Sequence, residues 1–176
     1  MKKIVVLLLI TLLLLCSCGQ RNEPAATDTE ITETETGALS NADPSKIIDA
    51  VYAALPEGSE AGRYVPELIT SDINEKTEEY YLGIKGVKYK KGAASEAFEQ
   101  PVTYSFCVVI FEDDADFDAE RIKIEQNINK SKWVCAAAEE AFVVRYKNTA
   151  AVIMGPKNVC AELENTFLSV AESIEK

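Results

Sequence analysis

Cysteine is the residue type in this sequence with the widest chemistry, and the chain has five cysteines but no histidine. Without an imidazole, the chain cannot form a serine triad, a cysteine–histidine pair or a zinc site that includes histidine. The absence of histidine therefore excludes more kinds of enzyme than any residue present supports. The sequence identifies no catalytic residue, no metal ligands and no cofactor site.

Cys107, Cys135 and Cys160 lie well beyond the amino-terminal region. An odd number of cysteines cannot all pair, their spacing is not that of a metal site, and no neighbouring base is available to activate a thiol as a nucleophile. We expect buried side chains that act as small apolar residues. Two alternatives stay open: one disulfide among the three, which export from the cell would permit, and a reactive thiol.

An acidic run in the middle of the chain fits part of the calcium-loop pattern. Asp114, Asp116 and Asp118 fall at the first, third and fifth positions of such a loop, and Glu125 falls at the twelfth. The sixth position is Ala119, where the sharp turn requires glycine. Acidic side chains are also favourable at a helix N-terminus. We therefore expect the start of a helix rather than a calcium site.

Four lysines, Lys85, Lys88, Lys90 and Lys91, form the one basic cluster of a chain whose formal net charge is −11. That net charge argues against a nucleic-acid partner. The cluster could bind an anionic wall polymer or phosphate headgroups. The alternative, which we favour, is an exposed edge strand that its lysines protect from unwanted pairing.

Two further residues complete the candidate interaction surface. Trp133 is the sole tryptophan, and its ring either forms a ligand platform or, as we favour, closes one end of the core. Arg145 is expected beside Val143 and Lys147 on the far side of the sheet, near Thr103, Ser105, Thr149 and Ala151. Such an open face could receive a partner, but a half-solvated antiparallel sheet requires none.

The amino-terminal residues 1–17 have the pattern of a signal peptide. Lys2 and Lys3 precede an apolar run of about a dozen residues, Ile4–Leu15, and small polar residues follow. A helix needs ~20 residues to cross the hydrocarbon core of a membrane. The run is therefore too short for a permanent transmembrane anchor.

The residues Leu15-Cys16-Ser17-Cys18 resemble the lipobox of bacterial lipoprotein precursors. The resemblance implies that Cys18 carries a thioether-linked diacylglycerol; Cys16 fits poorly, because Leu15 before it is too large for the peptidase. The alternative is an ordinary secretory signal. Two acyl chains anchor a protein stably to a bilayer. We therefore expect a lipid-anchored protein on the extracytoplasmic face of the cell membrane.

Residues 18–41 predict a flexible tether, because this stretch is rich in Thr and Glu and contains few large aliphatic side chains. Such a coil would span roughly 25–30 Å. Residues 42–176 have the size of a single domain.

The domain sequence alternates helical and strand patterns. Asp43 and Pro44 predict a capped helix start, with Ile47, Ile48, Val51 and Leu55 on one apolar face. Further helices are expected from Ser71 or Asp72 to Leu82, from the acidic run to a positive end at Lys130 and Lys132, and after Pro156. Strands are expected at 87–91, 100–111, 140–146 and 149–155, the last two joined by a tight turn at Lys147-Asn148.

The order helix, hairpin, helix, hairpin, helix predicts an α+β fold. We expect an antiparallel sheet of about four strands, with the helices mainly on one face. In the strand at 100–111, Val102, Tyr104, Phe106, Val108 and Ile110 should share one face.

The segments Y-Y-L-G-I-K-G-V, Y-S-F-C-V-V-I-F-E-D and V-V-R-Y-K-N-T-A-A-V-I-M-G resemble an uncharacterised family of small bacterial lipoproteins with a domain of unknown function. The likeness covers about Pro44 to Ile174 and implies no catalytic residues. The sequence therefore favours a non-enzymatic, membrane-tethered binding module whose partner is an envelope protein or an anionic wall polymer. Two alternatives stay open: a solute-capturing lipoprotein that serves a transporter, and a carboxylate-dependent enzyme.

Overall fold

A five-stranded antiparallel sheet forms the centre of the fold in a computed structural model that describes residues 37–97 and 102–176. These residues belong to one compact unit, Glu33–Lys176. The strands lie in the order β1-β2-β3-β5-β4, and each neighbouring pair is antiparallel. They are β1 (Leu68–Asp72), β2 (Tyr89–Ala97), β3 (Ser105–Phe111), β4 (Glu140–Tyr146) and β5 (Thr149–Gly155). The predicted α+β class is confirmed. The sheet has one strand more than expected, because the sequence pattern does not identify β1.

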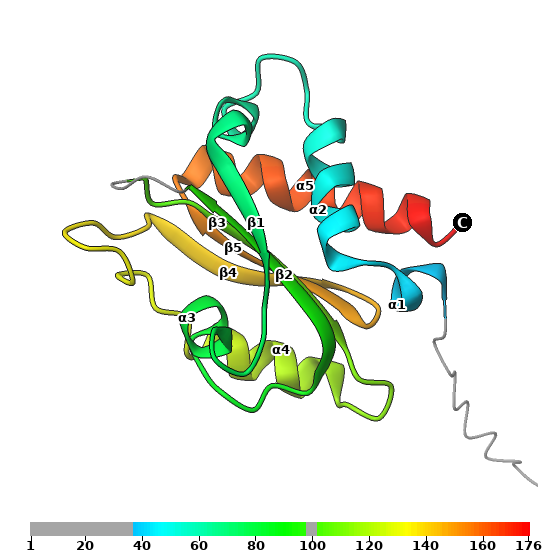
Figure 1. The fold of residues 1–176 in the computed structure, drawn as a ribbon. Coiled ribbons are helices and arrows are strands. Elements are labelled where there is room, and N and C mark those ends of the chain that lie inside the picture. Colours follow the sequence, from blue (N-terminus) through cyan, green and yellow to red (C-terminus); the bar gives the residue numbers. More distant parts are fainter. Residues whose placement is uncertain (1–36, 98–101) are drawn as a thin grey trace, which may run out of the picture. The chain divides into compact units, whose positions relative to one another are not determined.

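Helices cover both faces of this sheet (Figure 1). One face carries α1 (Ala38–Asn41), α2 (Pro44–Ala54) and α5 (Lys157–Ile174); the other carries α3 (Glu78–Leu82) and α4 (Phe117–Glu125). Two 3-10 helices, η1 (Ala61–Arg63) and η2 (Val65–Glu67), lead into β1. The two longest helices share one face as expected, but the far face is not open, which corrects the predicted half-solvated sheet.

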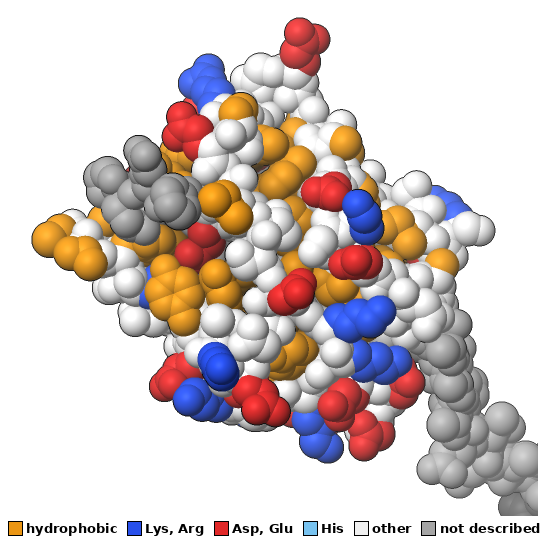
Figure 2. All heavy atoms as spheres, in the orientation of Figure 1, with side chains coloured by type: hydrophobic (Ala, Val, Ile, Leu, Met, Phe, Trp, Pro, Cys, Tyr) orange, Lys and Arg blue, Asp and Glu red, His pale blue; other side chains and the backbone are white. Residues whose placement is uncertain are grey.

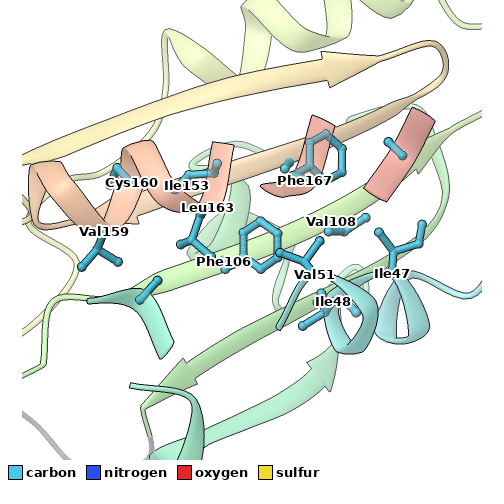
Figure 3. Packing of buried hydrophobic residues seen from close by; sticks show 14 of the residues in the cluster. Ile47, Ile48, Val51, Phe106, Val108, Ile153, Val159, Cys160, Leu163 and Phe167 are labelled. Carbon is cyan, nitrogen blue, oxygen red and sulfur yellow. The ribbon is translucent and has the colours of Figure 1, made fainter. Parts of the chain in front are cut away.

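The core of the first face forms where α2 and α5 meet the sheet (Figure 3). The residues predicted to share one face of this strand, Val102, Tyr104, Phe106, Val108 and Ile110, all belong to the core of the first face, which confirms that prediction. Burial of each large apolar side chain contributes roughly 1.5–3 kcal/mol to folding. The principal contacts join Phe106 and Val108 of β3 to Ile47, Ile48 and Val51 of α2 and to Val159, Leu163 and Phe167 of α5.

The core of the second face explains why β3 and β5 are buried along their whole length. Cys107, Val109 and Phe111 point to this side and pack against Leu82 of α3 and Ile124 of α4. A strand that is buried on both faces has an almost continuous apolar sequence rather than an alternating one. The runs F-C-V-V-I-F and A-A-V-I-M have this property.

The predicted helix from Ser71 or Asp72 to Leu82 is only partly correct. Ser71 and Asp72 end strand β1, and the helix starts at Glu78. Gly83 ends it at a positive φ of 78°, and a Cβ atom there would lie 2.0 Å from the Asn127 carbonyl oxygen. This position therefore requires glycine both for its backbone angle and for the close approach of a second segment.

The strand predictions differ in accuracy. The bounds of β4 and β5 agree with the predicted hairpin, whose turn places Lys147 at φ 53°. Strand β2 extends to Ala97 rather than ending at Lys91, and β3 starts at Ser105; residues 100 and 101 of the predicted strand lie outside the described residues.

The predicted tether is too long at its carboxyl end. Residues 38–41 form α1, in which Leu39 is 1% exposed and Ser40 is buried. The Leu39 N–H donates to Glu175 Oε2 at 2.9 Å, and Asn148 Nδ2 donates to Ser40 Oγ at 2.9 Å. The domain therefore includes α1. The predicted signal peptide, Cys18 and the tether up to residue 36 lie outside the described residues.

Candidate functional site

The four lysines of the predicted cluster are exposed at and before the start of β2. Lys90 Nζ lies 2.5 Å from Asp113 Oδ1, and Lys85 Nζ lies 3.4 Å from Glu79 Oε2. Acidic and basic side chains intermingle in the lower part of Figure 2. The cluster is not a uniformly basic surface, so its geometry gives no support to the binding of an anionic polymer.

The position of Lys88, Lys90 and Lys91 agrees with the edge-strand interpretation, but only for the first residues of β2. Strand β1 pairs with β2 only as far as Asp72 opposite Ala93. Within the described part of the chain, the first residues of β2 therefore have β3 on one side and no strand on the other. The register with β3 also shifts between Tyr89 and Lys91. Lysines and such irregularities both discourage pairing at an exposed sheet edge.

Two hollows flank the turn after β1, with volumes of about 450 and 560 Å³. Lys91 lines the first and Lys90 lines the second. Acidic residues outnumber the single lysine in each hollow, so neither presents the positive potential that would attract an anion. They are Asp43 and Asp72 in the first hollow and Glu75 and Glu78 in the second.

Trp133 is 4% exposed and belongs to the core of the second face. It forms an isolated bridge with Ala136, which closes a tight turn at Val134 and Cys135. A ring with so little exposed surface cannot serve as a platform for a ligand in this conformation. The structure therefore agrees with the core interpretation.

Arg145 is engaged with α4 rather than presented on an open face. Its Nη2 lies 3.1 Å from Asp118 Oδ1, its guanidinium carbon lies 5.9 Å from the Phe117 ring centre, and Nη1 donates to the Lys147 carbonyl. Ser105 and Thr149, its expected neighbours, are fully buried. The predicted surface of Lys85, Lys88, Lys90, Lys91, Trp133 and Arg145 is therefore not a single surface.

The acidic run behaves as a helix start. Asp116 caps α4 and accepts a hydrogen bond from the Ala119 N–H at 3.0 Å, while Asp118 pairs with Arg145. Within residues 37–97 and 102–176, no group of three or more Cys, Asp or Glu residues is placed to hold a metal ion.

The three described cysteines have free thiols. Cys107 and Cys160 are buried, on opposite faces of the sheet, as expected for small apolar residues. Burial raises the pKa of the Cys107 thiol to about 11. Cys135 differs from the expectation, because it is exposed at φ 63° in the turn after Trp133.

A buried ion pair, which the sequence pattern does not predict, joins Lys132 to Glu96. The Lys132 side chain is 3% exposed and the Glu96 side chain 13%. Lys132 Nζ also donates to Ser105 Oγ at 3.1 Å. Because Glu96 and Ser105 are register partners on β2 and β3, the sheet holds both acceptors in place.

Three aromatic rings enclose the Lys132 ammonium group. Nζ lies 4.4 Å from the ring centre of Tyr80, 5.1 Å from that of Tyr81 and 5.1 Å from that of Trp133. Cation–π attraction is strongest where the cation is desolvated, as it is here. The arrangement links α3, the sheet and the loop before β4 through one charge.

Tyr80 connects this ion pair to the surface. Its hydroxyl donates to Glu96 Oε2 at 3.1 Å. Burial, and next the nearby Glu96 carboxylate, raise the pKa of the Tyr80 hydroxyl well above its usual value. The hydroxyl therefore remains a hydrogen-bond donor, although the residue as a whole is 43% exposed.

A lysine beside a serine hydroxyl is also the arrangement of serine–lysine hydrolases. Here Lys132 is also paired with the Glu96 carboxylate. Ser105 is in addition fully buried. The geometry therefore does not support nucleophilic catalysis.

The charge pattern predicts Lys132 at the end of a helix, but this prediction is wrong, because α4 ends at Glu125. The signal that could have identified the ion pair is Glu96, the single charged residue in the strand segment G-A-A-S-E-A. A lone carboxylate in a strand of small residues requires a cation from elsewhere in the fold.

Three exposed apolar side chains are connected to this ion pair through its own residues or through a neighbour in sequence. Ile69 is 50% exposed and lies opposite Glu96 in the sheet register; Val134, 79% exposed, follows Trp133. We call Ile69, Tyr80 and Val134 the Tyr80 patch. In Figures 1 and 2, hydrophobic side chains lie over α3, over β1 and at the tip of the loop before β4.

Comparisons of the chain with protein-family models, with curated proteins and with solved structures find no match. Among the described residues, no helix is both long enough and apolar enough to span a membrane.

Proposed function

We propose that this chain is a lipid-anchored protein of the cell envelope that binds a partner protein through the Tyr80 patch. One observation carries the proposal. Four large hydrophobic side chains are exposed among the described residues, and three of them adjoin the buried ion pair: Ile69 lies opposite Glu96, Tyr80 donates a hydrogen bond to Glu96, and Val134 follows Trp133, whose ring lies beside Lys132. Exposed apolar side chains that cluster in this way are typical of interaction sites.

The ion pair beneath the patch supports a role in binding. The contacts of Tyr80 with Glu96 and Lys132 fix its side chain before any partner arrives. A tyrosine that is held in place loses little conformational entropy on binding, and tyrosine is enriched among the residues that contribute most to interfaces. Val134 and Ile69 add further exposed apolar area.

The location of the patch also suits a tethered protein. The described chain begins beside α1, which contacts Asn148 at the end of the β4–β5 hairpin. Ile69 of the Tyr80 patch lies on the opposite edge of the sheet from β4 but at the same end as the beginning of β4, and a strand of this length spans ~20 Å. Figure 1 places α1 and the loop before β4 on opposite sides of the domain. A lipid anchor ahead of α1 would leave the patch accessible.

Cell fractionation tests the anchor. We expect Cys18→Ala to abolish incorporation of a fatty-acid label and to release the protein from the membrane fraction, because the two acyl chains are the predicted attachment. Cys16→Ala is the matched control and should remain labelled and membrane-bound. If Cys18→Ala still sediments with membranes, the lipid anchor is refuted.

Crosslinking in intact cells tests the binding role with the native anchor present. A photoreactive residue at Val134 should give a discrete crosslinked product that the change Ile69→Asp weakens. The same group at Lys46, whose side chain is 78% exposed on α2, is the control and should give no such product. Identical products from both positions, or none from Val134, would contradict the proposal.

A further inference from the structure

Strand β1 is an exposed and unprotected edge of the sheet. Among the residues that the structure describes, it pairs only with β2, and residues 69–72 are all exposed. Its sequence, L-I-T-S-D, contains no lysine or proline, and its register with β2 is regular. Proteins commonly protect edge strands with lysine, proline or a bulge. By contrast, β4 at the opposite edge is at least half-buried, and its Arg145 pairs with Asp118.

The register determines which backbone groups of β1 point away from the sheet. The Ile73 N–H donates to the Gly92 carbonyl at 2.8 Å. Residues that face the neighbouring strand alternate in an antiparallel pair. Ser71 and Ile69 therefore direct their backbone groups toward β2, whereas Thr70 and Asp72 direct theirs outward, where an additional strand could pair with them.

Acidic side chains lie at both ends of this edge. Glu67 precedes β1 and Asp72 ends it, and both are exposed. A second copy paired antiparallel about Thr70 would bring Asp72 of one chain beside Leu68 and Glu67 of the other. That juxtaposition of like charges is unfavourable, and the net charge of −11 adds to it. Lys91 lines the same hollow as Asp72, but Asp43 lines it as well, so acidic side chains outnumber the lysine there.

We infer that the outer edge of β1 receives an extended segment of a partner protein, with basic residues at both ends and an apolar residue directed at the Tyr80 patch. This inference rests on the proposed binding function. The added strand would hydrogen-bond to the outward groups of Thr70 and Asp72, and its alternate side chains would meet Ile69 and Tyr80 on one face. Backbone pairing gives affinity in this mode, and the charges and the patch give selectivity.

Peptide binding to the full chain tests the inference directly. The probe is a seven-residue peptide of alternating threonine and valine with lysine at both ends, and its control has glutamate at both ends. By fluorescence anisotropy, we expect the lysine peptide to bind at least tenfold more tightly. Hydrogen exchange should slow at residues 68–72 when it binds.

Substitutions at Thr70 separate backbone pairing from side-chain contact. Thr70→Pro removes an outward N–H without removing a hydrogen bond to β2, and should lower the affinity for the lysine peptide at least tenfold. Thr70→Val keeps the N–H and should bind the lysine peptide with the affinity of the unchanged protein. A second test does not depend on how well the proline variant folds. Glu67→Lys with Asp72→Lys should reverse the preference and favour the glutamate peptide.

Several results would overturn the inference: equal affinity for the two peptides, no binding at millimolar peptide, or protection of another segment. Protection of residues 68–72 that rises with protein concentration alone would instead indicate a second copy. The cellular crosslink from Val134 separates the two proposals. If it persists in Thr70→Pro, the binding function stands and edge pairing is wrong; if wild-type cells give none, the binding function itself fails.

Discussion

At the scale of single residues, the fold buries the side chain of Lys132 and gives its ammonium group several partners. A buried ammonium group is costly unless it is paired and hydrogen-bonded. Lys132 has Glu96, Ser105 and the surrounding aromatic rings. Such pairs contribute little net stability relative to apolar residues, but removal of one partner is strongly destabilising.

Lys132→Met tests this directly. The change leaves the Glu96 carboxylate largely buried without its cation, and we expect the free energy of unfolding in urea to fall by ~3–5 kcal/mol. Adding Glu96→Gln to Lys132→Met should recover a large part of that loss. The control is Lys46→Met, at a surface pair with Asp49, which should change stability by less than ~1 kcal/mol. An unchanged stability in Lys132→Met would show that the pair is not structurally important.

A buried thiol makes stability depend on alkaline pH. Burial raises the pKa of Cys107 from 9.0 to about 11, so folding favours the protonated thiol. This contribution is complete below pH 9 and is lost as the pH rises from 9 through 11. We expect the unfolding free energy to fall over this range, and to fall less steeply in Cys107→Ala. Parallel pH profiles for the two proteins would contradict the assignment.

At the scale of elements, local sequence chemistry determines some parts of the fold and distant pairing determines others. The start of α2 is predictable, because the Asp43 side chain accepts the Ser45 N–H from only two residues away. The β4–β5 hairpin is equally local, since two apolar strands flank a tight turn. The edge strand β1 has no such pattern: its residues, four of which are exposed, form a strand where β2 pairs with them.

The candidate site was less accessible to sequence reasoning for the same reason. Lys132 and Glu96 meet only because the loop before β4 folds back over the sheet. Arg145 is expected on an open face of the sheet, but α3, α4 and the loop cover that face, whereas the favoured core position of Trp133 agrees with the structure. Exposure depends on which elements pack over a strand, and no local pattern in the sequence specifies that packing.

At the scale of the whole molecule, the domain begins earlier than its hydrophobic pattern suggests. Leu39 lies in a stretch of small and polar residues, yet it is buried against the first-face core. Its N–H is bound by Glu175, which also accepts a hydrogen bond from Lys147 Nζ at 3.0 Å. The first and last residues of the domain thus stabilise each other.

Truncation tests this boundary. A chain that begins at Ala42 exposes the site of Leu39 and leaves the Glu175 carboxylate without its backbone donor. We expect its unfolding free energy to be ~2–3 kcal/mol lower than that of a chain that begins at Gly37, the amount associated with burial of one leucine side chain. Leu39→Ala in the full chain should show a loss of similar size, because it removes the same buried side chain without shortening the protein. Equal stability of the two truncated chains would mean that α1 belongs to the tether, and that the folded domain begins at α2.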